Sequence, residues 1–162
     1  EGLKIVYVGD GNNVARSLCL GVASVGAHFA IASPSGYALD EDTLSEARCR
    51  ASSSGTDVIS TQSLQEALSG ADVVYTDVWT SMGQEDESQA RRNDFQGYTV
   101  DADLLSCARW DAILMHPMPA HYGEEVSSGM LEQPQSVAFD QAENRLHAQK
   151  ALLEHILGPG EE

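Results

Sequence analysis

Short apolar runs alternate with longer stretches of mixed character along this chain. Five runs are typical of buried strands, and they lie near residues 3–9, 27–33, 57–60, 73–77 and 112–116. Between them, apolar residues recur at helical spacing, as in 13–25, where Val14, Leu18 and Val22 share one face. Because strands that alternate with helices pair in parallel, the pattern predicts an α/β fold, with a doubly wound, mainly parallel sheet flanked by helices.

Local signals predict where several helices begin and end. Ser63 and Glu66 have capping-box spacing, and Gly70 is expected to end the short helix that follows. Asp101 is expected to start another helix, and a closing helix is predicted for 142–157. The apolar positions of the closing helix are Leu146, Leu152, Leu153, Ile156 and Leu157.

Two stretches have no regular pattern, 52–55 and 80–94. The second follows the strand that ends near Asp77 and is too long to be a plain connection. A polar loop of this length at the carboxyl end of a strand is expected to be a lid or a binding loop. A disordered surface excursion is the alternative.

Composition narrows the class of function. Twenty-five acidic residues against nine basic ones give a net charge of −16 over 162 residues, which repels nucleic acid and anionic lipid. The length fits one domain with its own core. No stretch approaches the roughly 20 apolar residues of a membrane span, and the chain begins with no secretory leader. We therefore expect a soluble cytoplasmic protein that binds neither nucleic acid nor membrane.

The cysteines and the first glycines argue against a metal or a cofactor. Cys19, Cys49 and Cys107 are widely spaced, so reduced core thiols and no metal site are expected. Gly9-x-Gly11 follows the first strand, but the third glycine of a dinucleotide fingerprint is replaced by Val14, and the second strand does not end in an acid. The prediction is a Rossmann-like three-layer sandwich without a dinucleotide site.

Three motifs in order resemble those of the ornithine carbamoyltransferases. They are Gly9-Asp10-Gly11-Asn12-Asn13, Asp77-x-x-x-Ser81-Met82-Gly83 and Ala142-Glu143-Asn144-Arg145. The likeness covers nearly the whole chain but corresponds to the second half of such an enzyme. The Ser-x-Arg-Thr-Arg and His-Pro-x-Gln motifs of the family's first domain do not occur. The resemblance implies that residues 1–162 are the ornithine-binding domain, without the carbamoyl-phosphate domain.

The resemblance assigns the ornithine site to four residues. Asn13 would bind the polar head of the amino acid, although an asparagine there could instead be a helix N-cap. Asp77 would supply the fixed anion that faces ornithine, or else cap the loop that follows. Ser81 and the Met82 amide would join Asn13 in binding the carboxylate. By itself, Met82 would be interpreted as core packing.

The fifth strand ends in His116-Pro117-Met118-Pro119, where the family has His-Cys-Leu-Pro. In the family this cysteine, with the aspartate, is credited with accepting the amine proton, a role that Pro117 cannot take. A His-Pro-Leu-Pro sequence is found at this place in the sister aspartate carbamoyltransferases. The carbonyls of Pro117 and Met118 can still accept from the carbamoyl NH₂ group. His116 is either a buried, hydrogen-bonded histidine or a donor to the carbamoyl oxygen. Asp77, His116 and Pro117 are therefore the catalytic candidates.

Arg145 would by default lie on the solvent face of the closing helix. The family motif implies instead that it faces carbamoyl phosphate, where a guanidinium binds a dianion. The segment 121–125 also resembles the family, and we expect it to form a loop and a helix start.

The resemblance implies transfer of the carbamoyl group from carbamoyl phosphate to the side-chain amine of L-ornithine, giving L-citrulline and phosphate in arginine biosynthesis. Orientation of the substrates, without a metal or cofactor, would carry the catalysis. The full-length protein would be a homotrimer built mainly through the missing N-terminal domain. The alternatives are a carbamoyltransferase for another amine or acylated ornithine, and a non-catalytic amino-acid-binding homologue. A fragment of a longer enzyme accounts most simply for the missing half.

Overall fold

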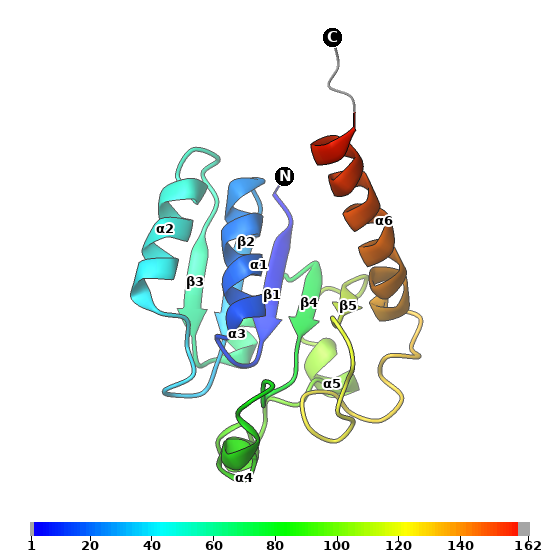
Figure 1. Ribbon diagram of the computed structural model, residues 1–162. Helices are drawn as coiled ribbons and strands as arrows, with labels where there is room; N and C mark the ends of the chain where they lie inside the picture. The colour runs from blue at the N-terminus through cyan, green and yellow to red at the C-terminus, as the bar shows by residue number, and fades with distance from the viewer. Residues whose placement is uncertain (1, 159–162) are drawn as a thin grey trace.

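The computed structural model describes residues 2–158, which form a five-stranded sheet flanked by helices. The strands are β1 (Lys4–Val8), β2 (His28–Ala32), β3 (Val58–Thr61), β4 (Val73–Thr76) and β5 (Ile113–Met115). Their spatial order is β3-β2-β1-β4-β5, and all neighbouring pairs are parallel. The predicted doubly wound parallel sheet is confirmed. Figure 1 shows the strand arrows pointing towards the end of the molecule at which α4 (Ser88–Asp94) lies.

The remaining helices connect the strands or follow the last one. They are α1 (Asn13–Ser24), α2 (Glu41–Ala51), α3 (Leu64–Leu68), α5 (Ala102–Leu105) and α6 (Ala138–Leu157), with a 3₁₀ turn, η1 (Glu85–Glu87), before α4. The predicted caps are confirmed, because Ser63 Oγ accepts from the Glu66 amide and Asp101 Oδ1 from the Leu104 amide.

Three expectations about local structure were wrong. The segment 80–94 is irregular only over 80–84, since η1 and α4 occupy 85–94. The closing helix begins at Ala138, before the predicted start, because burial of Ala138 in the core fixes its first turn. No helix starts within 121–125, where the backbone instead forms a turn closed by a hydrogen bond from the Gly123 amide to the Val126 carbonyl. Contacts distant in sequence decided the first two cases.

The sheet is covered on both faces, as the residues of β1 illustrate. Val6 packs into one apolar cluster with Leu68 of α3, while the neighbouring Tyr7 packs into the other with Cys19 of α1 and Leu44 of α2. Successive strand side chains point to opposite faces, so a single strand contributes to both layers of the core. The two clusters hold the carboxyl ends of the strands in place.

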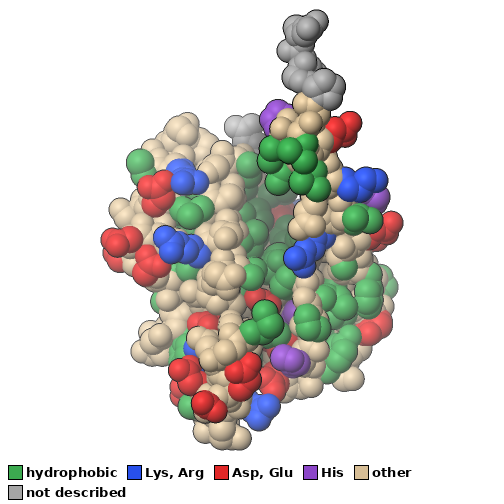
Figure 2. All heavy atoms as spheres, in the orientation of Figure 1, with side chains coloured by type: hydrophobic (Ala, Val, Ile, Leu, Met, Phe, Trp, Pro, Cys, Tyr) green, Lys and Arg blue, Asp and Glu red, His purple; other side chains and the backbone are tan. Residues whose placement is uncertain are grey.

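Helix α6 is attached to the rest of the domain mainly through its first turns. Its one buried residue is Ala138. Apolar side chains farther along are more than half exposed, namely Phe139, Leu146, Leu152, Leu153, Ile156 and Leu157, and Figure 2 shows apolar side chains gathered on this helix. The described part of the chain therefore leaves the predicted apolar stripe uncovered.

The sequence predicted reduced cysteines in the core and no membrane-spanning helix. All three cysteines are free, as predicted, but only Cys19 is buried. The expectation of core thiols was wrong for Cys49 and Cys107, because the first lies on the exposed side of α2 and the second in the turn after α5. Among residues 2–158, no helix combines the length and the apolar character needed to cross a membrane.

Candidate functional site

The carboxyl ends of β1 and β4 lie side by side at the centre of the sheet. The chain leaves β1 towards β2 on one side and leaves β4 towards β5 on the other. Open parallel sheets bind small molecules at such a switch point, because the two connections diverge and leave a crevice. Two of the three sequence motifs follow these two strands, so the fold brings them together.

The turn after β1 packs closely against the loop after β2. A Cβ atom added to Gly11 would lie 2.6 Å from the Ala38 carbonyl carbon and from the Leu39 nitrogen. The Gly11 amide also donates to the Tyr37 carbonyl over 2.7 Å. Only glycine fits this close approach of two backbones, which accounts for the second glycine of the Gly-x-Gly motif without a nucleotide.

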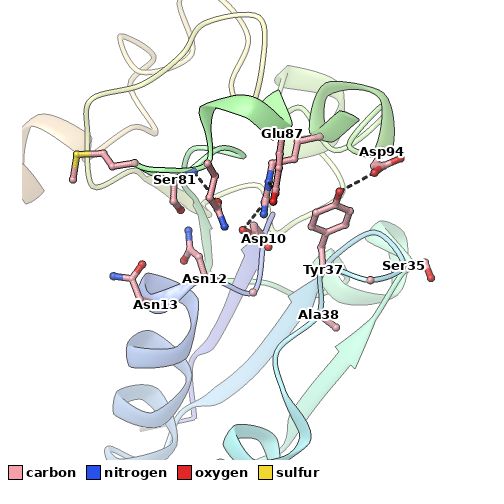
Figure 3. Close-up of a pocket in the computed structure, with 14 residues that line it drawn as sticks. Asp10, Asn12, Asn13, Ser35, Tyr37, Ala38, Ser81, Glu87 and Asp94 are labelled. Carbon is pink, nitrogen blue, oxygen red and sulfur yellow. Dashed lines mark hydrogen bonds and ion pairs between the residues drawn. The ribbon is translucent and has the colours of Figure 1, made fainter. Parts of the chain in front are cut away.

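Asn12, not Asn13, is the N-cap of α1. Its Oδ1 accepts from the Val14 and Ala15 amides over 2.9 and 3.0 Å. The alternative in which Asn13 caps the helix was therefore wrong. Asn13 is the first helical residue, its side chain is exposed, and Figure 3 shows it at the start of the helix beside Asn12. This position leaves the Asn13 amide free to bind a ligand.

Asp77 follows β4 and is held by two neutral donors. Its Oδ2 accepts from Asn12 Nδ2 over 3.1 Å, and its Oδ1 accepts from the Val78 amide over 2.8 Å. The side chain is buried, and among the described residues no cation forms an ion pair with it. Neutral hydrogen bonds fix the direction of a carboxylate without cancelling its charge. Asp77 thus caps the loop that follows through the Val78 amide, and its role as an anion facing ornithine stays a prediction.

Arg91 of α4 attaches the segment 80–94 to the turn after β1. Its guanidinium donates to Asp10 Oδ2 and to the Trp79 carbonyl, both over 2.9 Å, and to Glu87 Oε2 over 3.0 Å. Burial lowers the pKa of Arg91, but the bonds to Glu87 and Asp10 outweigh burial and raise this pKa above its ordinary value. Sequence reasoning did not single out this residue, since its buried partner Asp10 lies 81 positions away along the chain.

A cleft of about 800 Å³, here called the loop cleft, lies between the β1–α1 turn, the β2–α2 loop and residues 81–94. Three of the residues predicted to bind ornithine line this cleft, namely Asn13, Ser81 and Met82. Figure 3 shows Ser81 across the cleft from Asn12 and Asn13. The Ser81 amide donates to Gln84 Oε1 over 3.2 Å, and the Met82 side chain is 98% exposed, which excludes the core-packing interpretation.

A second cleft of about 670 Å³, the helix cleft, lies between α1, the ends of β4 and β5, and the start of α6. Pro117 and Arg145 line it together with Asn13, which borders both clefts. Arg145 is exposed and has no ion-pair partner among residues 2–158. The donors Asn13 and Arg145 thus face one space with the Pro117 backbone.

His116 is fully buried, and both of its ring nitrogens are used. The Met118 amide donates to Nδ1 over 2.9 Å, so Nε2 carries the proton and donates to Glu125 Oε1 over 3.2 Å. This favours the interpretation of His116 as a buried strand-end histidine.

Met118 lines neither cleft, and its positive φ of 55° marks the kind of backbone conformation that clusters at functional sites.

One group of His and Glu side chains, His121, Glu124 and Glu125, lies close enough together to hold a metal. Its carboxylates already have partners, however. Glu124 pairs with Arg92 over 2.8 Å, and Glu125 accepts from His116 and from the His121 amide. We assign no metal to this group.

A sequence profile described as "Aspartate/ornithine carbamoyltransferase, Asp/Orn binding domain" matches residues 1–156. The chain belongs to this carbamoyltransferase family. Ornithine carbamoyltransferase from Oceanobacillus iheyensis is 49% identical over 157 residues, which are 97% of this chain and 49% of that protein. The one from Acidothermus cellulolyticus is 51% identical over 157 residues, which are 97% and 50% of the two chains.

The solved structure of ornithine carbamoyltransferase from Pyrococcus furiosus has a TM-score of 0.93 and 46% identity, covering 99% of this chain and 51% of that one. The chain thus spans about half the length of the curated relatives it matches. Within this carbamoyltransferase domain, the residues that sequence reasoning missed are Tyr75, Arg91 and Gln141. They are ordinary strand and helix residues by pattern, and only their positions beside the clefts single them out.

Proposed function

We propose that this chain is the ornithine-binding domain of an ornithine carbamoyltransferase, which forms L-citrulline and phosphate from carbamoyl phosphate and L-ornithine. The observation that carries the proposal is the buried Asp77 carboxylate at the switch point, oriented by Asn12. An amino acid with two ammonium groups needs such a fixed anion. The activity named for the relatives supports the same conclusion.

Ornithine also needs neutral donors for its carboxylate, and the loop cleft offers three. Asn13, Ser81 and the Met82 amide border it, and Asn12, which also lines it, donates to the Asp77 carboxylate. A free alkylamine has a pKa near ~10.4, so the reacting amine must lose its proton in the site. Holding the α-ammonium and the carboxylate firmly leaves the side-chain amine as the end that meets the carbamoyl carbon.

The helix cleft is suited to carbamoyl phosphate. Arg145 supplies a guanidinium for the phosphate dianion, and the Pro117 carbonyl can accept from the carbamoyl NH₂ group. The same role is proposed for the Met118 carbonyl, although Met118 does not line this cleft. Asn13 borders both clefts, so the two substrates would meet beside it. His116 supports this arrangement by holding the Met118 amide.

A carbamoyl-phosphate domain is part of the proposal. It would cover the exposed apolar side chains of α6 and complete the phosphate site, and in the full-length protein it would build a homotrimer. Arginine biosynthesis follows as the pathway, because citrulline is a precursor of arginine. The cytoplasmic setting expected from the composition stays a prediction.

Pro117 favours one alternative, a carbamoyltransferase for another amine or for an acylated ornithine, because it replaces the family's cysteine. Citrulline formation tests both. The isolated chain should form none, since it lacks the family's phosphate-binding motifs, while the full-length protein should form citrulline from ornithine. Turnover by the pure 162-residue chain would refute the half-site proposal. Preference of the full-length protein for N-acetylornithine would favour the alternative.

A further inference from the structure

Tyr75 lies at the back of the helix cleft, with its hydroxyl at the junction of β4, β5 and α6. Its side chain is 7% exposed and its ring stacks on Tyr7, with 5.8 Å between the ring centroids. It points to the same side of β4 as Asp77, two residues later. The motif-based assignment of the site gives this tyrosine no role.

The orientation of the Gln141 side chain determines what the Tyr75 hydroxyl can do. The His116 amide donates to Gln141 Oε1 over 3.0 Å, so the Nε2 end of this amide must face the other way. There Nε2 donates to the Tyr75 oxygen over 2.9 Å. The phenol oxygen is therefore an acceptor in this contact, and its own proton is not used.

Tyr75 lines the helix cleft, which gives its free hydroxyl proton a space to point into. Among residues 2–158, no other group shares a hydrogen bond with this hydroxyl. Burial and the nearby Asp77 charge raise the pKa of Tyr75 despite the opposing effect of the Gln141 bond, so the phenol keeps its proton at neutral pH. A neutral O–H group thus faces the space that Asn13 and Arg145 also line.

We propose that Tyr75 is a substrate-contacting hydrogen-bond donor and that Gln141 is the positioning residue that directs its proton into the helix cleft. This inference rests on the proposed function. The ligand atom is an oxygen acceptor, present on both substrates: the ornithine carboxylate, and the carbonyl or phosphate oxygens of carbamoyl phosphate.

The first test is Tyr75→Phe in the full-length protein, which removes the donor and keeps the ring that stacks on Tyr7. We expect the KM for one substrate to rise about fivefold, the effect of losing one neutral hydrogen bond. A rise for ornithine identifies its carboxylate as the acceptor, and a rise for carbamoyl phosphate identifies an oxygen of that substrate. The matched control is Tyr98→Phe, because the Tyr98 hydroxyl donates to the Gln62 carbonyl beside α3.

Gln141→Glu tests the positioning role. A carboxylate at 141 still accepts from the His116 amide, but it also accepts the Tyr75 proton and turns this proton away from the cleft. The variant should raise the same KM as Tyr75→Phe, and combining the two should add little, because both remove one interaction. Additive effects would overturn the positioning role.

A fluorine resonance gives a readout that does not need turnover. With 3-fluorotyrosine at position 75 of the full-length protein, the ¹⁹F signal should shift on addition of L-norvaline or of inorganic phosphate, matching the substrate whose KM changed. The same label at position 98 should not respond. A silent label at 75, or KM changes below about twofold for both substrates, would overturn the proposal. Absence of citrulline formation by the wild type would refute the proposed function instead, while the titration would still test Tyr75.

Discussion

The side-chain amide of Asn12 donates a 3.1 Å hydrogen bond to Asp77 Oδ2 and so joins the exit of β1 to the exit of β4. The orientation of Asn12 is determined by its cap role, since its Oδ1 accepts from two helical amides and from the Tyr7 hydroxyl. Its NH₂ group therefore points towards Asp77. The start of α1 thereby fixes the direction of the Asp77 carboxylate.

The first prediction concerns Asp77→Asn in the full-length protein. An amide can still accept from Asn12, so the fold should persist, but the fixed charge facing ornithine is lost. We expect kcat/KM for ornithine to fall by the equivalent of about 2 to 4 kcal/mol, with carbamoyl phosphate binding nearly unchanged.

Steady-state kinetics measures this loss, and Asp72→Asn is the matched control. Asp72 lies at the amino end of β4, where it accepts from the Lys4 amide and pairs with Arg109. The substitution Asp72→Asn removes the same charge from the opposite end of the same strand. Unaltered kinetics with ornithine in the Asp77 variant would show that Asp77 only caps its loop.

The second prediction concerns the ion pair of Arg91 and Asp10, both buried. Burial raises the pKa of Asp10, with Arg91 acting in the opposite direction. Arg91→Leu should lower the free energy of unfolding by about 3 kcal/mol or more, because it leaves a buried carboxylate unpaired. Urea denaturation followed by circular dichroism measures this.

The double variant Arg91→Leu with Asp10→Asn provides the control, because it also removes the carboxylate charge that Arg91→Leu leaves unpaired. Its stability should recover in part towards the wild type. Arg92→Leu, which removes an exposed pair with Glu124, should cost far less. If Arg91→Leu and Arg92→Leu cost the same, α4 is not anchored through Arg91.

The third prediction uses Pro117. If a thiol were required as the proton acceptor, the natural protein should be nearly inactive. We expect instead that the full-length protein works with proline and that Pro117→Cys gains less than about tenfold, since proximity contributes about 7 kcal/mol or more and a positioned base about 3 to 5 kcal/mol.

Citrulline formation against pH for the wild type and Pro117→Cys decides this. A gain of about a hundredfold in the cysteine variant, with the pH profile moved towards neutral, would contradict the expectation. It would mean that the thiol supplies a step which orientation in the helix cleft does not replace.

The fourth prediction is a pH dependence of stability at the start of α2. Asp40 caps this helix, and the hydrogen bonds from the Thr43 amide and hydroxyl lower its pKa below the ordinary value of 3.8. A pKa lower in the folded than in the unfolded state stabilises the fold above 3.8, and the benefit is lost as the pH falls through the folded-state pKa.

Thermal unfolding of the wild type and Asp40→Asn should therefore differ most at neutral pH, with the wild type the more stable, and the difference in Tm should shrink in acid. Asp103→Asn in the first turn of α5 is the control, since the Asp103 side chain makes no hydrogen bond within residues 2–158. A Tm difference for Asp40 that stays constant with pH would show that charge plays no part in this cap.

Much of the fold could be read from the chain because its determinants are local. Apolar runs separated by helical spacing specify strands and helices, and Ser63 and Asp101 bond to amides three residues ahead. The parallel order follows, because alternating elements have few other ways to bury both faces of a sheet. The family motifs likewise stand as continuous stretches of sequence.

What only the tertiary structure decided depends on contacts between distant residues. Arg91 meets Asp10 across 81 positions and anchors α4, so that 85–94 are helical where the composition predicts a loop. Gln141 meets Tyr75 across 66 positions and turns a strand tyrosine into a donor facing the cleft. Periodicity indicates which side chains are buried, but it does not identify their polar partners. Hydrogen bonds and ion pairs are directional, and they form only after the sheet has brought the ends of its strands together.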